Sequence, residues 1–214
     1  MPRATDTRDR ILDLAESAVL AKGFDATSID ELVAGAEITK GGFFYHFPDK
    51  TALARALIER YIAREEALFD DLFGRAADLS DDPLHAFLIG LKLLAELLED
   101  LPGGHPGCLI ATAAYQDRLF DDGVRALNRQ AVLAWRARFR AHLERIANRY
   151  PPRVGADIEA LADMVTGVVE GGIILSKVLR DPSALARQVM AFRALVALVF
   201  TPPPPALRSG GEAA

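Results

Sequence analysis

The 214-residue sequence contains a single cysteine, Cys108, and few aromatic residues. One cysteine excludes an intrachain disulfide, which is typical of proteins that fold in a reducing compartment. Aromatic residues make up 7% of the chain and hydrophobic residues 50%. This composition favours a globular protein with a mostly aliphatic core over a disordered chain.

The sequence also lacks a long hydrophobic run without charges. The polar N-terminal residues lead into no apolar segment, so we expect no signal peptide. The most apolar stretch, 158–178, carries four charged side chains, which a membrane helix would rarely tolerate. The expectation is therefore a cytoplasmic protein that does not enter a membrane.

An excess of basic residues is missing as well. The formal net charge is −5, and residues 1–50 carry six Lys and Arg against nine Asp and Glu. Nucleic-acid-binding domains usually carry a basic face, so bulk charge argues against DNA binding. Only a local group of potential cations remains at Lys40, His46 and Lys50, and any interaction with DNA must be argued from geometry there.

Helical periodicity is present in almost every segment, and no stretch alternates convincingly at period two. Capping residues, glycines and prolines divide the chain into about nine helices, three short ones followed by six mostly longer ones. We therefore predict an all-α fold with an N-terminal three-helix module and a C-terminal helical body. The helices are expected at about 7–22, 29–36, 39–47, 50–73, 83–100, 108–118, 121–148, 154–180 and 183–200, in domains 1–50 and 51–201 that precede a disordered tail, 202–214.

Two short helices within the first 50 residues have the pattern of a helix-turn-helix. Ser28 and Glu31 form a capping box for the first helix, and Thr39 can cap the second. The second helix carries Gly41 and Gly42 near its start, which should cost roughly 1 kcal/mol each relative to alanine. Bare backbone at this place lets a helix approach another surface closely, as a helix must when it enters the major groove.

The same residues admit a structural alternative, in which the Gly-Gly-aromatic run is a tight turn followed by core side chains. Phe43 and Phe47 are four residues apart and are expected in the core under either interpretation. In the DNA interpretation, Thr39 and Lys40 reach base edges and phosphates. Residue types alone leave both interpretations open.

Residues 11–57 closely resemble the DNA-binding domain of the TetR family of transcription regulators. The resemblance implies an all-helical, repressor-type homodimer that binds double-stranded DNA at a pseudo-palindromic operator. It also implies that a small molecule, the effector, binds the C-terminal body and releases the operator, without a metal or other cofactor. The residues that carry the resemblance, all at the family's spacing, are Ile11, Ala15, Phe24, Thr27–Ile29, Leu32, Ala36, the run Thr39–Lys50 and Leu53.

The resemblance also implies which residues touch DNA. Phosphate contacts are expected before the first helix of the motif and after the second, and base contacts at the start of the second. Lys50 lies at the N-terminus of the next helix, where free amides and the helix dipole favour an anion. The DNA-binding candidates are Thr27 and Ser28 for phosphates, Thr39, Lys40 and Gly42 for the groove, and Tyr45, His46 and Lys50 as phosphate clamps.

Two positions depart from the family pattern. Glu37 occupies a turn position that usually holds glycine, so a slightly different turn geometry is expected. Phe44 occupies the position of the usual tyrosine and has no hydroxyl group for a phosphate. The neighbouring Tyr45 can supply a hydroxyl group, but it points about 100° further around the helix.

Beyond residue 57 the resemblance is one of architecture only. We expect a ligand-binding body whose pocket accepts a small apolar or amphipathic effector, with the polar tip of an aromatic side chain orienting it. The candidates are large side chains on the central helices, most of which belong to the core. They are Phe69, Phe73, Phe87, Leu91, Tyr115, Phe120, Trp135, Phe139 and Met164.

The last two helices are predicted to form the dimer interface. Gly167 and Gly171 lie one helical turn apart and permit a close helix–helix approach, and 183–200 has a broad apolar stripe. The two helices of each subunit would form a four-helix bundle across a twofold axis, and packing within one chain is the alternative. The interface candidates are Gly167, Gly171, Leu175, Phe192, Val196 and Val199.

Chemistry beyond binding has little support in the sequence. Cys108 opens a helix after a glycine-rich loop, so a redox-sensing thiol and a small buried hydrophobe are both open, the second being more typical. The histidines lack the spacing of metal ligands, and no catalytic or nucleotide-binding motif is present. We predict that the protein is not an enzyme. The alternatives are a helical protein-interaction module without DNA binding and an all-α enzyme that uses Cys108 or a carboxylate–histidine pair.

Overall fold

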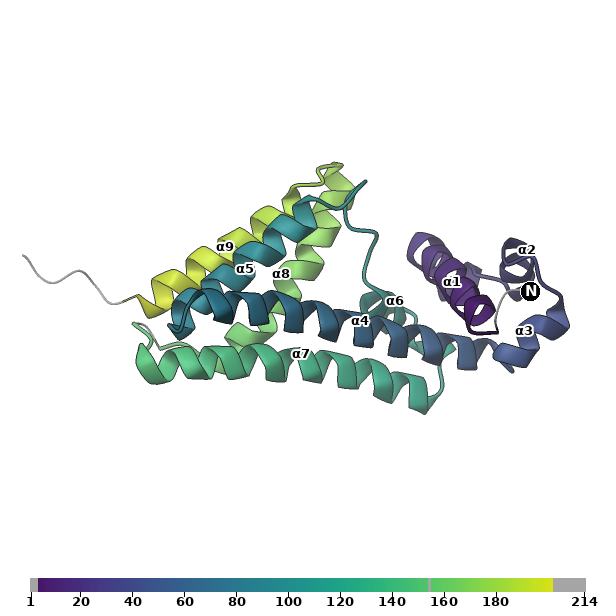
Figure 1. Cartoon of the computed structure of the whole chain (residues 1–214), viewed down its shortest axis with the longest axis horizontal. Helices are drawn as coiled ribbons and strands as arrows, with labels where there is room; N and C mark the ends of the chain where they lie inside the picture. The colour runs from purple at the N-terminus through teal and green to yellow at the C-terminus, as the bar shows by residue number, and fades with distance from the viewer. Residues whose placement is uncertain (1–3, 154, 202–214) are drawn as a thin grey trace, which may run out of the picture.

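The computed structural model describes residues 4–153 and 155–201, and within these ranges every regular element is a helix. Figure 1 shows α1–α3 at one end of an elongated molecule, α4 and α7 along its length, and α5, α8 and α9 at the other end. The predicted all-α fold is confirmed. The elements are α1 (Ala4–Ala26), α2 (Ile29–Gly35), α3 (Lys40–His46), α4 (Lys50–Leu79), α5 (Pro83–Glu99), α6 (Leu109–Tyr115), the short 3₁₀ helix η1 (Asp117–Leu119), α7 (Asp122–Arg149), α8 (Ile158–Leu179) and α9 (Ala184–Phe200).

The first helix breaks at Gly23. Its backbone has φ 87° and ψ 166°, a region that only glycine occupies without strain. The break turns Phe24 into the core against Phe120, with ring centroids 4.8 Å apart. Its amide donates to Oε1 of Gln116 at 2.7 Å. Gln116, the residue just before η1, therefore stabilises the break in α1. This contact links the N-terminal module to the body.

The turn between α2 and α3 is a Schellman motif. The amide of Ile38 donates to the carbonyl of Val33 at 3.1 Å, and that of Glu37 to the carbonyl of Ala34 at 3.2 Å. Glu37 has φ 51°, the left-handed conformation that this motif requires at its C′ position. The expectation of a different turn at Glu37 is therefore corrected, because the glutamate itself adopts the conformation that glycine usually supplies.

The fourth helix is longer than the sequence predicted. It was expected to end near Phe73, but α4 continues through Gly74 to Leu79. A single exposed glycine costs roughly 1 kcal/mol in a helix, and the burial of Ala76 on the face of Phe69 and Phe73 offsets this cost. The longer helix extends along α7 and joins the N-terminal module to the body without a break.

The body is packed through close approaches at two glycines. A Cβ atom at Gly90 of α5 would lie 2.5 Å from the ring of Phe73. One at Gly172 of α8 would lie 2.6 Å from Leu185 of α9. Neither position accepts a side chain, so α4, α5, α8 and α9 are held in one core. The predicted disordered tail lies outside the described residues.

Candidate nucleic-acid interface and cavity

The two hydroxyl residues before α2 differ in what they can contact. Thr27 is 1% exposed, and its hydroxyl donates to the carbonyl of Gly23 at 2.8 Å. The expected phosphate contact of the Thr27 side chain is therefore corrected, because this side chain closes the turn between α1 and α2. Ser28 is exposed, and its Oγ accepts from the amide of Glu31 at 3.2 Å. Its hydroxyl proton remains available for a phosphate oxygen.

The start of α3 is open to the surroundings. Oγ1 of Thr39 accepts from the amide of Gly42 at 3.1 Å, so its hydroxyl proton also remains available. A Cβ atom at Gly41 or Gly42 would meet nothing nearer than 3.5 Å, so packing within the chain does not require either glycine. Lys40 is exposed, and its Nζ lies 2.7 Å from Oδ1 of Asp30. Three of the predicted groove residues therefore share one accessible corner.

The end of α3 and the start of α4 hold the three expected phosphate clamps. Tyr45 is 79% exposed, and its ring packs edge-on against His46 at 5.1 Å. The Nζ of Lys50 donates to the carbonyl of Asp25 at 3.4 Å, and desolvation lowers the pKa of this lysine. A shallow groove between α2 and α3 brings Lys50 together with Ser28 and Lys40.

Phe44 forms part of the wall of that groove. Its ring is 46% exposed and meets Phe43 edge-on at 5.5 Å. Phe43 and Phe47 are buried as predicted, with 0% and 2% exposure. The aromatic run of α3 therefore divides into two core side chains and two surface side chains, Phe44 and Tyr45.

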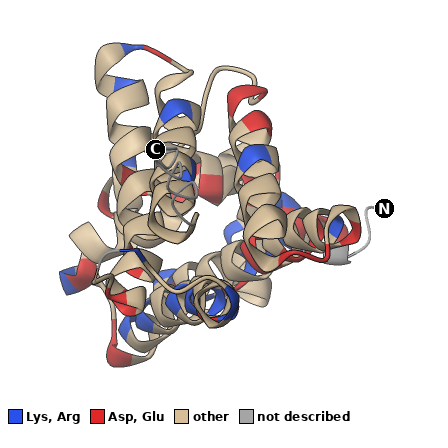
Figure 2. Ribbon diagram, turned by 90° about the vertical axis from the view of Figure 1, so that its left-hand side faces the viewer, with Lys and Arg blue, Asp and Glu red and all other residues tan. Residues whose placement is uncertain are grey.

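Acidic side chains neutralise two of the lysines around the helix-turn-helix. Lys22 is paired with Glu31 at 2.6 Å in the same way that Lys40 is paired with Asp30. Figure 2 shows Lys and Arg interspersed with Asp and Glu throughout the molecule. The overall charge distribution of the structure therefore does not favour DNA binding. An interface with DNA depends on the hydrogen-bond donors of α3 and of the groove between α2 and α3.

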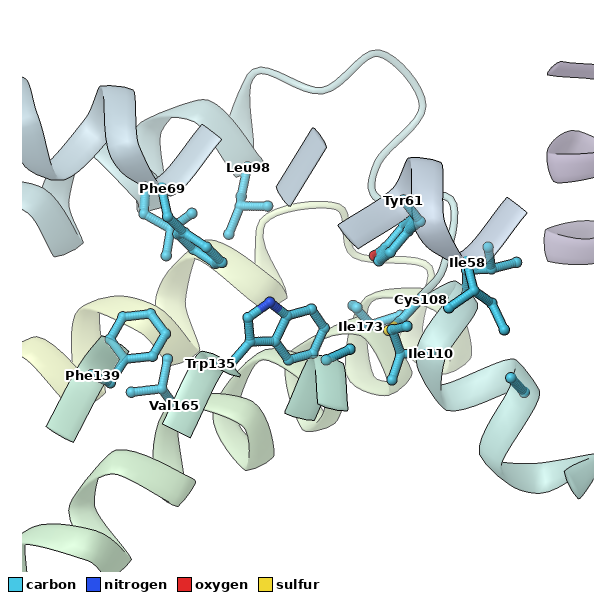
Figure 3. Close-up of a cluster of buried hydrophobic side chains, with 14 of the residues drawn as sticks. Ile58, Tyr61, Phe69, Leu98, Cys108, Ile110, Trp135, Phe139, Val165 and Ile173 are labelled. Carbon is cyan, nitrogen blue, oxygen red and sulfur yellow. The ribbon is translucent and has the colours of Figure 1, made fainter. Parts of the chain in front are cut away.

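A cavity of about 290 Å³ lies within the body. Side chains of α4, α5, α7 and α8 form most of its walls, Glu16 and Leu20 of α1 contribute at one end, and the loop 105–108 covers one side. Most of the lining is apolar, with Leu98 on α5 and Val165 on α8 as examples. Figure 3 shows Trp135 between two groups of side chains, Phe69 and Phe139 on one side and Tyr61 and Cys108 on the other.

The predicted pocket residues divide into three groups. Three line the cavity: Phe69, Trp135 and Phe139. Four are core residues outside it, because they pack between helices elsewhere: Phe73, Phe87 and Leu91 where α4 meets α5, and Phe120 against the break in α1. The expectation for the last two is corrected, because their side chains point outward: Tyr115 and Met164 are 82% and 39% exposed.

Sequence reasoning missed the polar groups of the cavity. Glu65 lies one turn after Tyr61 and one turn before Phe69 on α4, and Glu170 interrupts the apolar sequence of α8. Burial raises the pKa of Glu65 to about 7 and also raises that of Glu170. A carboxylate among apolar residues at helical spacing was the available signal in the sequence.

Cys108 lies beside these carboxyl groups. It is 6% exposed, and burial together with Glu170 raises the pKa of its thiol to about 12. A reactive cysteine needs the opposite shift. The geometry therefore favours the interpretation of Cys108 as a small buried residue that lines the cavity.

The expected dimer residues also divide. Phe192, Val196 and Val199 are at most 6% exposed because they pack within the chain, so their assignment to the interface is corrected. Gly167 and Gly171 face open space, and Leu175 is 37% exposed. Most of the apolar residues that α8 and α9 leave uncovered lie along one side of each helix and are called here the outer face: Met164, Gly167, Gly171, Ile174, Leu175, Val178, Met190, Ala194 and Leu198.

In 4–153 and 155–201 there is no group of three or more His, Cys, Asp or Glu side chains placed to hold a metal ion. Over the same residues, no helix combines the length and the apolar character needed to cross a bilayer.

Comparison with known proteins agrees with this geometry. The family described as "Bacterial regulatory proteins, tetR family" matches residues 11–57, and "Tetracyclin repressor-like, C-terminal domain" matches residues 92–192. Together the two matches cover more than half of the chain. The match across the body extends the resemblance well beyond residue 57.

Three similar proteins illustrate the relationship. The uncharacterized HTH-type transcriptional regulator YxaF of Bacillus subtilis is 24% identical, over 84% of this chain and 90% of its own length. The HTH-type transcriptional repressor NemR of Escherichia coli is 38% identical over 27% of this chain and 29% of its own. A crystal structure of regulatory protein TetR from Rhodobacter sphaeroides has TM-score 0.71 at 24% identity, covering 87% of this chain and 97% of the other; this likeness concerns the fold.

The fold and the two matches define a helix-turn-helix transcription regulator rather than an enzyme. The chain belongs to the TetR family. Members of this family bind DNA operators and effectors, and they typically dimerise.

Proposed function

We propose that the protein is a cytoplasmic homodimer that represses transcription from a pseudo-palindromic operator until a small effector enters the cavity. The observation that carries the proposal is the open start of α3. There, the hydroxyl group of Thr39, the exposed Lys40 and the bare backbone of Gly41 and Gly42 face outward, next to a groove that holds Ser28 and Lys50. This set suits phosphate and base contacts in a major groove.

The outer face is the surface through which the second subunit would bind. Gly167, Gly171 and Ile174 recur along one side of α8, and Met190 and Leu198 along one side of α9. Water-exposed apolar rows of this length on two neighbouring helices are typical of an interface. A twofold axis through them would form a four-helix bundle, and an operator with two half-sites would match that symmetry.

The link between cavity and DNA runs through α1 and α4. Glu16 of α1 accepts from Arg60 at 2.8 Å and is also paired with Arg64. Both Glu16 and Arg64 line the cavity. A ligand that moves α4 or Arg64 therefore acts on the ion pairs that hold the N-terminal module, which is the differential contact that release requires.

The test is a gel-shift titration with DNA from upstream of the protein's own gene, at several salt concentrations. We expect a complex at submicromolar protein that weakens as salt rises, because phosphate contacts release counterions. Lys40→Ala should weaken it, whereas Lys92→Ala, an exposed lysine of α5, should not. Absence of a salt-dependent complex, or unchanged regulation in cells after Lys40→Ala, would favour the alternative of a protein-interaction module without DNA binding.

A further inference from the structure

We propose that the cavity binds an organic cation, an apolar amine or ammonium compound that also carries a hydrogen-bond acceptor. Glu65 and Glu170 would hold the cation, and the indole N–H of Trp135 would donate to the acceptor. This inference names the effector class of the proposed function, and its effect on DNA rests on that function.

Two carboxyl groups of the cavity form no ion pair with any residue in 4–153 and 155–201. Glu65 on α4 and Glu170 on α8 line the same space, and neither takes part in an ion pair among the residues that the structure describes. Behind burial, the charge of Glu170 contributes to raising the pKa of both Glu65 and Cys108. Two uncompensated carboxylates in an apolar space are unfavourable, and a bound cation would remove that cost.

The other charged groups that face the cavity compensate them only in part. The charge of Arg64 lowers the pKa of Glu65, but burial outweighs it, and this guanidinium is paired with Glu16 at the α1 side. Lys177 donates to the carbonyl of Pro106 at 2.5 Å on the outside of the covering loop. Burial and Lys177 lower the pKa of His105, which keeps this imidazole neutral at physiological pH. The potential inside the cavity is therefore negative, which disfavours an anionic effector.

Trp135 provides an independent indication of a ligand. Its side chain is nine-tenths buried, and its Nε1 has no hydrogen-bond partner. In Figure 3 the nitrogen lies on the edge of the ring that is turned toward Leu98 and Phe69, both of which line the cavity. A buried donor without an acceptor is rare in folded proteins, so an acceptor on the ligand is the expected partner.

The aromatic lining suits the same class of ligand. Tyr61 and Trp135 line the same cavity as Glu65 and Glu170. Aromatic faces attract ammonium groups when both are removed from water. An apolar chain of modest size can fill the rest of a volume of about 290 Å³.

The experiment uses the fluorescence of Trp135, the only tryptophan in the chain, and contains no DNA. The full-length protein is titrated with 4-phenoxybutylamine, 4-phenoxybutanol and 4-phenoxybutyrate, which share one skeleton and differ in charge. A fourth probe, 5-phenylpentylamine, replaces the ether oxygen by a methylene group. Charge-assisted hydrogen bonds should make the first amine bind about tenfold more tightly than the alcohol. The carboxylate should bind weakest, and loss of the ether oxygen should weaken the amine severalfold.

Variants separate this inference from a nonspecific apolar pocket. Glu65→Gln and Glu170→Gln should each reduce the preference for the amine over the alcohol about tenfold. Glu59→Gln, an exposed position on the same helix, should leave it unchanged. Both cavity variants remove a buried ionisable group and should fold, which a melting curve checks. Because the pKa of Glu65 is raised to about 7, amine binding by the unmodified protein should strengthen from pH 6 to pH 8, where the amine itself stays protonated.

The inference is overturned if the alcohol or the carboxylate binds as tightly as the amine, if no probe gives a saturable response, or if both glutamine variants keep the preference. A gel shift tests the proposed function separately. An amine that binds but leaves the DNA complex intact would support this inference and contradict effector release. A salt-dependent DNA complex without amine binding would contradict this inference and support DNA binding by the protein.

Discussion

One oxygen atom distinguishes Phe44 from the tyrosine that the family pattern places in the same groove wall. The ring is already half exposed beside Ser28, Lys40 and Lys50. We expect Phe44→Tyr to raise operator affinity up to about tenfold, because a hydroxyl group donating to a phosphate is a charge-assisted hydrogen bond. A gel-shift titration at fixed salt measures the change.

A matched variant tells whether the gain depends on the groove. Phe120→Tyr adds the same atom in the buried contact with Phe24 and should not strengthen DNA binding. Unchanged or weaker binding of Phe44→Tyr would mean that no phosphate lies in the groove between α2 and α3.

The left-handed backbone conformation of Glu37 lowers the stability of the turn between α2 and α3. This conformation costs a residue with a Cβ atom about 1–2 kcal/mol, and glycine avoids the cost but loses more entropy on folding. We therefore expect Glu37→Gly to stabilise the protein by about 0.5–1 kcal/mol. Urea denaturation measures the free energy of unfolding.

Glu66→Gly serves as the control, since this exposed residue lies within the continuous helix α4. It should destabilise by about 1 kcal/mol. If both glycine variants lower the free energy of unfolding, the strain assigned to Glu37 is not present.

At the scale of elements, the contact between α1 and α4 is the part that joins cavity and DNA. Removing the charge of Glu16 breaks its pairs with Arg60 and Arg64. We expect Glu16→Gln to reduce the ratio of DNA affinities without and with a bound effector at least about threefold, since coupling energies are typically 1–3 kcal/mol. Gel shifts with and without a ligand identified by fluorescence give this ratio.

The pair Arg75–Asp71 lies on α4 far from α1 and is exposed. Asp71→Asn therefore serves as the control and should leave the ratio unchanged. An unaltered ratio in Glu16→Gln would assign the coupling to another contact, such as that between Gln116 and Asp25 at 2.6 Å.

The elements themselves were well predicted where local signals mark their ends. Ser28 and Thr39 cap helices as expected, because a capping bond depends on neighbours two or three residues away. The end of α4 was predicted too early. No local signal shows that Ala76 is buried against other elements, and tertiary packing outweighed the glycine at 74.

At the scale of the whole molecule, the outer face predicts a dimer that one charge would break. Leu198 is 67% exposed on α9 and lies on this face. We expect Leu198→Glu to yield monomers in size-exclusion chromatography with light scattering, because a buried unpaired carboxylate opposes association. DNA affinity should fall with it, since one subunit reads only half of an operator.

Leu79→Glu is a matched control, as Leu79 is 69% exposed at the end of α4. This variant should remain dimeric. A dimeric Leu198→Glu protein would place the interface elsewhere on the molecule.

Only part of the functional sites could be predicted from the sequence. Most of the predicted DNA-binding residues belong to one contiguous run of the sequence, so they also lie close together in the structure. The cavity is formed mainly by α4, α5, α7 and α8, with two residues of α1, and periodicity does not tell which apolar side of a helix faces a void. Phe73 and Phe139 illustrate this limit: both are buried aromatic residues, but only Phe139 lines the cavity. The same ambiguity placed Val196 at the interface instead of in the core.

The unbroken course of α4 has a mechanical consequence. At about 1.5 Å per residue, roughly 22 Å of rigid helix separates Lys50 at the groove from Glu65 at the cavity. Tilting such a rod by about 5° at one end displaces the other by about 2 Å. In a twofold dimer the two α3 helices would move in opposite directions. Their separation would then change by about twice that amount, which is comparable to the rise of one base pair, about 3.4 Å. A small expansion of the cavity would therefore be enough to change the spacing of the two α3 helices so that it no longer matches the two half-sites of the operator.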